Sequence, residues 1–184
     1  MRRMMMAAGL AGLLLGSAAL GQSNAAAGAG AGIIAPRLTP VFTLRIELAK
    51  PVEQGVIDGA RHRFIAITGG TITGAKLTGT VMAGGGDWQA IHPGGLAVLD
   101  ARYFLKASDG TVISITNPGV RVASAEVTER LARGEDVDPA AYYFRSSPRF
   151  EVAAGAYDWL TRKVFVARGI RRPDHVELEV FEVE

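Results

Sequence analysis

The chain has 184 residues, 48% of them hydrophobic, with 20 Lys and Arg against 18 Asp and Glu and no cysteine. The absence of cysteine excludes disulfides, thiol catalysis and cysteine-ligated zinc. The near balance of charge excludes the basic surface on which nucleic-acid binding depends, so we expect no nucleic-acid partner.

The first segment, residues 1–25, predicts a signal peptide for export. Arg2 and Arg3 precede an apolar run, and small residues then allow cleavage after Gly21 or after Ala25. Both arginines leave with this leader, which makes the rest of the chain nearly neutral. The apolar run is too short for a comfortable bilayer span. We therefore expect a periplasmic or extracellular protein with no membrane contact after the leader is removed.

The next stretch, residues 26–39, is rich in Ala, Gly and Pro and has too little side-chain volume to pack. It predicts a flexible linker before a single domain at residues 40–184. The domain begins with "VFTLRIEL" at residues 41–48, where apolar and polar side chains alternate. This alternation is typical of a half-buried strand.

Further short segments, bounded by Gly, Pro, Asn or Asp-Gly, also predict strands. They are Arg63–Thr68, Ala75–Met82, Leu96–Lys106, Val112–Thr116, Tyr142–Arg145, Phe150–Val152, Lys163–Ala167 and Val176–Val183. Asp109 and Gly110 favour a tight hairpin turn between two of them. Many short strands with Gly-rich turns indicate an all-β domain, either a sandwich or a closed barrel.

One segment breaks the strand pattern and predicts a single short helix. Ser124 is a suitable N-cap, Val127 and Leu131 lie four apart, and Gly134 ends the segment. In a barrel such an insertion either crosses an open end as a lid or runs along the outer wall as a connector.

The stretch "GGGDW" places three glycines before an acidic and an aromatic residue. Gly84–Gly86 predict a bulge or wide turn at the rim of the domain. Asp87 and Trp88 either anchor this turn through hydrogen bonds and packing or line a ligand pocket.

A second charged pair lies in the apolar run "LAVLDARYFLK". Strand alternation places Asp100 and Arg102 on one face, opposite Leu99 and Tyr103. If this face points outward, the two charges form an ordinary surface pair. If it points inward, they are buried together and form a polar floor for a cavity.

Four motifs, taken in order, resemble the family called domain of unknown function 3237, also known as uncharacterised protein family 0311. They are "ITGGTITGAKLTGTVMAGGGDW", "LDARYFLKASDGTVI", "YYFRSSPRFEV" and "YDWLTRKVFVARGIR", and the similarity covers residues 40–183. The resemblance implies a single antiparallel β-barrel of lipocalin-like or calycin-like shape, with an interior that could hold a small molecule. Together with the predicted helix, it gives a barrel with one short helical insertion.

The first functional hypothesis is a barrel that binds a small aromatic or carboxylated organic ligand. Trp88, Tyr157 and Trp159 would supply apolar contact, while Arg102 and Arg145 would hold a carboxylate or enolate. The sequence carries no signal for a particular oligomeric state.

Two alternatives use the same barrel. In the first, it is an enzyme of the isomerase, hydratase or lyase type, with Asp87 or Asp100 as general base and an arginine stabilising an oxyanion. In the second, it is a structural protein whose interior is filled by side chains. No cofactor or metal is expected, because His62, His92 and His175 lack the spacing of a zinc site.

Overall fold

The structure is a computed structural model that describes residues 34–184. The predicted signal peptide, residues 1–25, and the linker up to residue 33 lie outside the described residues. The first strand, β1, begins at Leu38, close to the predicted start of the domain at residue 40.

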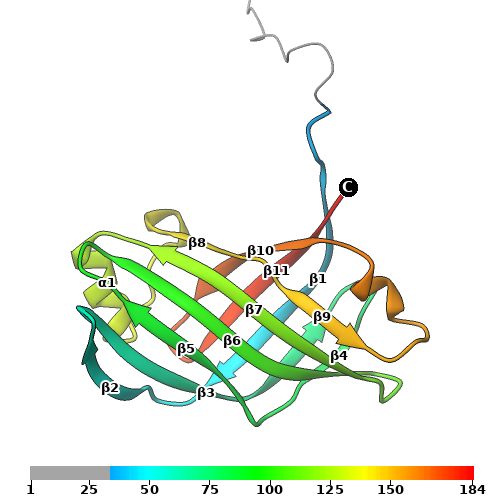
Figure 1. Cartoon of the computed structure of the whole chain (residues 1–184), viewed down its shortest axis with the longest axis horizontal. Coiled ribbons are helices and arrows are strands. Elements are labelled where there is room, and N and C mark those ends of the chain that lie inside the picture. The colour runs from blue at the N-terminus through cyan, green and yellow to red at the C-terminus, as the bar shows by residue number, and fades with distance from the viewer. Residues whose placement is uncertain (1–33) are drawn as a thin grey trace, which may run out of the picture. The chain divides into compact units, whose positions relative to one another are not determined.

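The described residues form strands joined by short turns, with one α-helix and two short 3₁₀ helices (Figure 1). The strands are β1 (Leu38–Leu48), β2 (Val52–Ile57), β3 (Ala60–Thr73), β4 (Gly79–Val81), β5 (Gly85–Ile91), β6 (Leu96–Ala107), β7 (Val112–Val122), β8 (Tyr143–Ser146), β9 (Arg149–Val152), β10 (Phe165–Arg171) and β11 (His175–Val183). The helices are α1 (Ala125–Ala132), η1 (Pro139–Ala141) and η2 (Asp158–Thr161).

Pairing between the strands closes the sheet into a barrel. The order β6-β5-β3-β1-β11-β10-β8-β7 returns to β6 through the long β6–β7 hairpin, and every pairing is antiparallel. The short strands β2, β4 and β9 pair with members of this ring. The predicted antiparallel barrel with one helical insertion is therefore confirmed.

Side-chain alternation explains the first strand. Leu44 and Ile46 of β1 are buried, while Arg45 and Glu47 point outward, as the sequence predicts. A register shift next to Pro40 lets the strand bury two consecutive residues before regular alternation begins.

The prediction of a rim turn at Gly84–Gly86 is wrong for two of the three glycines. Gly84 has a φ of 106° and lies in the turn, but Gly85 and Gly86 belong to β5. A Cβ atom on Gly85 would lie 2.4 Å from Cβ of Tyr103, and one on Gly86 would lie 2.0 Å from the Phe64 ring. Gly85 therefore lets the backbone of β6 come close, and Gly86 lets the Phe64 ring pack directly over the strand.

Two apolar clusters occupy most of the barrel interior. The larger includes Leu105, Ile113 and Phe165. The smaller includes Leu99 and Phe144 and lies toward the end that α1 covers (Figure 1). The barrel interior is therefore apolar on both sides of the region in which the two clusters meet.

The predicted helix is confirmed, and its place in the fold follows from its packing. Ser124 Oγ accepts a hydrogen bond from the Val127 backbone N–H at 3.2 Å, which caps the first turn. Leu131, the buried residue of α1, packs into the smaller apolar cluster. Among residues 34–184, no helix has both the length and the apolar character needed to cross a membrane.

Replacing Gly86 by alanine should destabilise the barrel by about 1–3 kcal/mol, because the new methyl group must displace the Phe64 ring. In a Phe64→Ala background the same replacement should have almost no effect. Urea unfolding of the four proteins in this double-mutant cycle measures the coupling. An equal loss in both backgrounds would show that the Phe64 ring is not the reason for glycine at this position.

Candidate functional site

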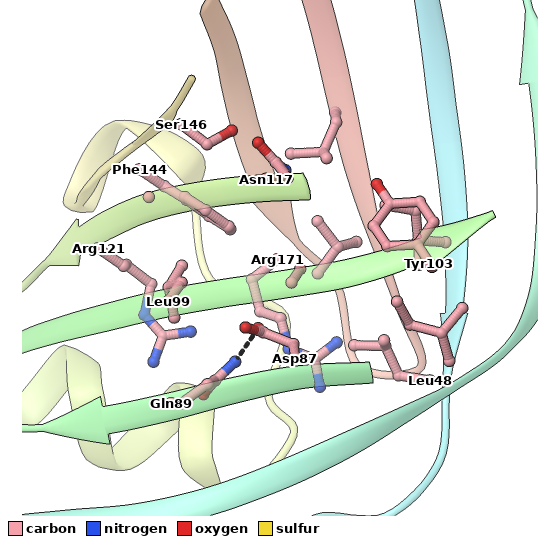
Figure 2. A pocket seen from close by; sticks show the side chains of 16 residues that line it. Leu48, Asp87, Gln89, Leu99, Tyr103, Asn117, Arg121, Phe144, Ser146 and Arg171 are labelled. Atoms are coloured by element: carbon pink, nitrogen blue, oxygen red, sulfur yellow. Dashed lines mark hydrogen bonds between the residues drawn. The ribbon is translucent and has the colours of Figure 1, made fainter. Parts of the chain in front are cut away.

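A cavity lies inside the barrel where the two apolar clusters meet (Figure 2). All eight strands of the ring contribute to its wall, and about 40 Å³ of it is open to the centres of water molecules. This space is enough for about three water molecules. Its polar lining residues are Asp87, Gln89, Tyr103, Asn117, Arg121, Ser146 and Arg171. The interior is therefore neither completely filled nor completely apolar.

A chain of hydrogen bonds fixes the carboxyl group of Asp87. Arg63 Nε donates to Gln89 Oε1 at 2.8 Å, and Gln89 Nε2 donates to Asp87 Oδ2 at 2.5 Å. Alternation along β5 points Asp87 and Gln89 to the same inner face, and β3 places Arg63 opposite Gln89. The second carboxyl oxygen, Oδ1, is buried and has no hydrogen-bond partner within the described residues.

Burial makes Asp87 an unusual acid. Removal from water raises the pKa of its carboxyl group from 3.8 to about 6. The hydrogen bond from Gln89, the positive charges of Arg63 and Arg121 and, as the smallest effect, the backbone N–H of Asp100 oppose this rise. Asp87 therefore changes its charge close to neutral pH, which is the range in which a proton acceptor is useful.

Arg121 is a buried cation on the inner face of β7. The residue is only 5% exposed, and its side chain makes no hydrogen bond or ion pair within residues 34–184. Burial, reinforced by the positive charges of Arg63 and Arg171, lowers the pKa of its guanidinium group to about 10. Arg121 therefore remains charged at neutral pH without a protein anion to neutralise it directly.

Arg171 also lines the cavity, but its guanidinium group donates hydrogen bonds to the turn between β10 and β11. Nη1 donates to the backbone carbonyls of Arg172 and of His175, the latter at 2.8 Å, and Nη2 donates to that of Pro173 at 3.4 Å. Arg171 therefore adds positive charge to the cavity while its main contacts hold the turn.

Four buried side-chain oxygens in the described part of the chain lack hydrogen-bond partners: Asp87 Oδ1, Tyr103 Oη, Asn117 Oδ1 and Ser146 Oγ. All four residues line this one cavity (Figure 2). Buried polar atoms almost always have a partner, supplied by protein, water or a ligand. Burial, with a smaller effect from Asp87, also raises the pKa of Tyr103, so its hydroxyl group keeps its proton and stays a donor.

The structure brings only one of the sequence-predicted site residues, Asp87, into this cavity. Trp88 points to the opposite face of β5, where it is 47% exposed and packs against Phe64 at 4.8 Å between ring centroids. Asp100 and Arg102 take the outward alternative and form an exposed surface pair, with 2.8 Å between Asp100 Oδ2 and Arg102 Nη2.

The remaining predicted ligand residues also lie away from the cavity. Arg145 is on the outer wall, where its guanidinium group lies 5.1 Å from the centre of the Tyr143 ring. Tyr157 precedes η2 and Trp159 belongs to it, and both side chains pack against the larger apolar cluster. The ring centroids of Trp159 and Phe165 lie 5.8 Å apart, so Trp159 packs against the larger apolar cluster.

The sequence analysis does not identify Arg121, because the predicted strand that corresponds to β7 ends too early. Thr116 was the predicted end, since a proline follows at position 118, whereas β7 continues to Val122. The inward alternation that starts at Ile113 runs on through Asn117 to Arg121. If the alternation of inward and outward residues is continued past Pro118, it predicts that Asn117 and Arg121 both point inward.

These features define a closed antiparallel β-barrel with a small polar cavity that carries excess positive charge. Residues 36–183 match the family model described as "Protein of unknown function (DUF3237)". The chain therefore belongs to this family, and the resemblance seen in the sequence is confirmed.

Relatives of known sequence or structure cover almost the whole domain. A UPF0311 protein of Bradyrhizobium diazoefficiens is 39% identical over 143 residues, which is 78% of this chain and 93% of the relative. The crystal structure of a conserved protein of unknown function from Rhodopseudomonas palustris is 35% identical, with a TM-score of 0.80 over 83% of this chain and all of the other.

A more distant structure has the same fold. It is described as an enzyme from Penicillium herquei, and it matches with a TM-score of 0.64 over 84% of this chain and 99% of the other, at 21% identity. At that level of identity the likeness shows the fold alone.

The Asp87→Asn variant should be more stable than the parent at pH 8 and nearly equal to it at pH 4. Because the native pKa is about 6 and the unfolded pKa is 3.8, native Asp87 holds its proton over a range in which the unfolded chain has lost it. The parent therefore loses stability as the pH rises through 6, by about 3 kcal/mol. The asparagine side chain cannot ionise, so the variant does not lose this stability as the pH rises. Urea unfolding across this pH range measures the difference, and a difference that stays constant would contradict a buried carboxyl group.

Proposed function

We propose that the barrel binds a small organic carboxylate in its interior cavity, with Arg121 as the direct partner of the carboxylate. The observation that carries this proposal is the buried guanidinium group of Arg121, which makes no ion pair or hydrogen bond within the described residues. An unpaired charge inside a protein is unfavourable, and an anion is the partner that relieves it.

The charges around the cavity support an anionic ligand. Two arginines, Arg121 and Arg171, line it, with a third, Arg63, buried behind Gln89, against the single acidic residue Asp87. A guanidinium group matches a carboxylate in shape, because two parallel N–H groups can donate to its two oxygens. The positive excess therefore favours a carboxylate over a neutral or cationic ligand.

The other lining groups indicate what the rest of the ligand contains. Tyr103 and Ser146 offer hydroxyl groups and Asn117 an amide group, each with a side-chain oxygen that lacks a partner. A carbonyl or hydroxyl group on the ligand would meet them. Leu99 and Phe144 supply apolar surface for the carbon skeleton. A keto or hydroxy acid combines these properties.

The size of the cavity limits the ligand. Space for about three waters corresponds to about 90 Å³ of liquid water, which suits an acid of a few carbon atoms. The Phe144 ring lies against Gly169, where a Cβ atom would come within 2.4 Å of it, so the glycine lets the ring lie close to the wall. The aromatic residues that the sequence suggested as ligand contacts lie elsewhere, so the geometry favours a short carboxylate over an aromatic ligand.

Acetate, lactate and pyruvate should bind the parent protein and raise its melting temperature, whereas acetamide and lactamide should not. Arg121→Gln should weaken carboxylate binding at least tenfold, because it removes the charged partner of a buried contact. The matched control is Arg102→Gln, which removes a guanidinium group from the outer wall and should leave binding unchanged. Titration calorimetry and thermal melting measure both effects.

Two results would contradict the proposal. The first is a parent protein that binds none of the carboxylates at millimolar concentration. The second is an Arg102→Gln variant that loses binding as fully as Arg121→Gln does, which would place the anion site on the outer wall.

A further inference from the structure

We propose that Asp87 removes a proton from the carbon next to the carbonyl group of a short 2-keto acid held in the cavity, so that the barrel catalyses enolisation. This inference rests on the proposed function, because Arg121 must first bind the carboxylate. It goes beyond binding by assigning a reaction to the carboxyl group beside the ligand.

The hydrogen bonds of Asp87 suit a general base. Gln89 holds Oδ2, and Arg63 holds Gln89, so the carboxyl group is fixed in one orientation. Oδ1 remains without a partner within the described residues, on a side chain that lines the cavity (Figure 2). A base needs one oxygen free to take the proton and a fixed position relative to the substrate.

The two aspartates that the sequence offered as bases differ in this respect. Asp100 lies on the outer wall, where both of its carboxyl oxygens accept hydrogen bonds from Arg102. Among residues 34–184, Asp87 makes no direct ion pair, although Arg63 and Arg121 lie close enough to favour its ionised form. Burial brings its pKa close to neutral pH, where a base is most effective. Only Asp87 therefore combines an available oxygen with a place inside the barrel.

The cavity also supplies groups for the charge that develops on the substrate. When the C–H bond breaks, an O–H bond forms at Asp87 Oδ1 and the electron pair moves onto the keto oxygen, which gives an enolate. Tyr103 and Ser146 each line the cavity with a hydroxyl group that lacks a partner, and either group is available to donate a hydrogen bond to this oxygen. Exchange of the Asp87 proton with water, followed by return of a solvent-derived proton from Asp87 to carbon, restores the keto acid. The step therefore needs no oxidant, reductant or second substrate, and in D₂O it places deuterium on the substrate.

Exchange of the methyl protons of pyruvate for deuterium tests the step. Proton NMR in D₂O near neutral pH should show exchange at least tenfold faster with the parent protein than in buffer alone. Asp87→Asn keeps the shape of the side chain and a hydrogen bond to Gln89, and it should bind pyruvate yet lose the acceleration. Asp87→Ala serves as a second variant, and Arg102→Gln is the matched control that should exchange like the parent.

Calorimetry on the same samples separates the two proposals. A parent protein that binds pyruvate without accelerating exchange, or an Asp87→Asn variant that exchanges as fast as the parent, overturns the catalytic role and leaves binding intact. Binding of acetate without binding of pyruvate overturns the keto acid as substrate. Failure to bind any carboxylate overturns both the reaction and the proposed function.

Discussion

Closure of the barrel is the constraint on which the site depends. Every second residue of each strand in a closed sheet points inward, so polar residues at inner positions on different strands must share one enclosed space. Asp87 on β5, Asn117 and Arg121 on β7 and Arg171 on β10 meet for this reason, although they are far apart in the sequence. None of them can reach bulk water by turning to the other face. Their charges therefore act on one another across the cavity.

The layering of the interior gives these polar groups their properties. Along β7 the inward residues are apolar at Ile113 and polar at Asn117 and Arg121. Ala123, just after the strand, is apolar again and belongs to the smaller cluster near α1. The polar residues consequently lie between two apolar clusters. In such a setting electrostatic interactions are stronger than in water. The same burial raises the pKa of the Asp87 carboxyl group and lowers the pKa of the Arg121 guanidinium group, so the acid and the cation acquire their properties from one cause.

Sequence alternation predicted most strands, but it could not identify the site. For Leu96–Lys106 it placed Asp100 and Arg102 on one face and Leu99 and Tyr103 on the other, and it left open which of the two faces points inward. For β5 the signal fails, because Gly85 and Gly86 fit a strand only where the backbone of β6 approaches Gly85 and the Phe64 ring covers Gly86. Those contacts join residues distant in the sequence. The end of β7 fails for a local reason, since a proline conceals the continuing alternation toward Arg121.

The cost of this interior argues against a purely structural barrel. The larger apolar cluster shows that this chain can fill an interior with well-packed hydrophobic side chains such as Leu105 and Ile113. Replacing buried ionic groups by such residues is often neutral or stabilising. The middle layer instead keeps an acid whose ionisation is unfavourable and, within the described part of the chain, a cation without a direct partner, two hydroxyl groups and one amide oxygen without hydrogen-bond partners. These unfavourable features are concentrated in one cavity. A binding or catalytic site requires such features, because a bound ligand supplies the missing hydrogen-bond and charge partners.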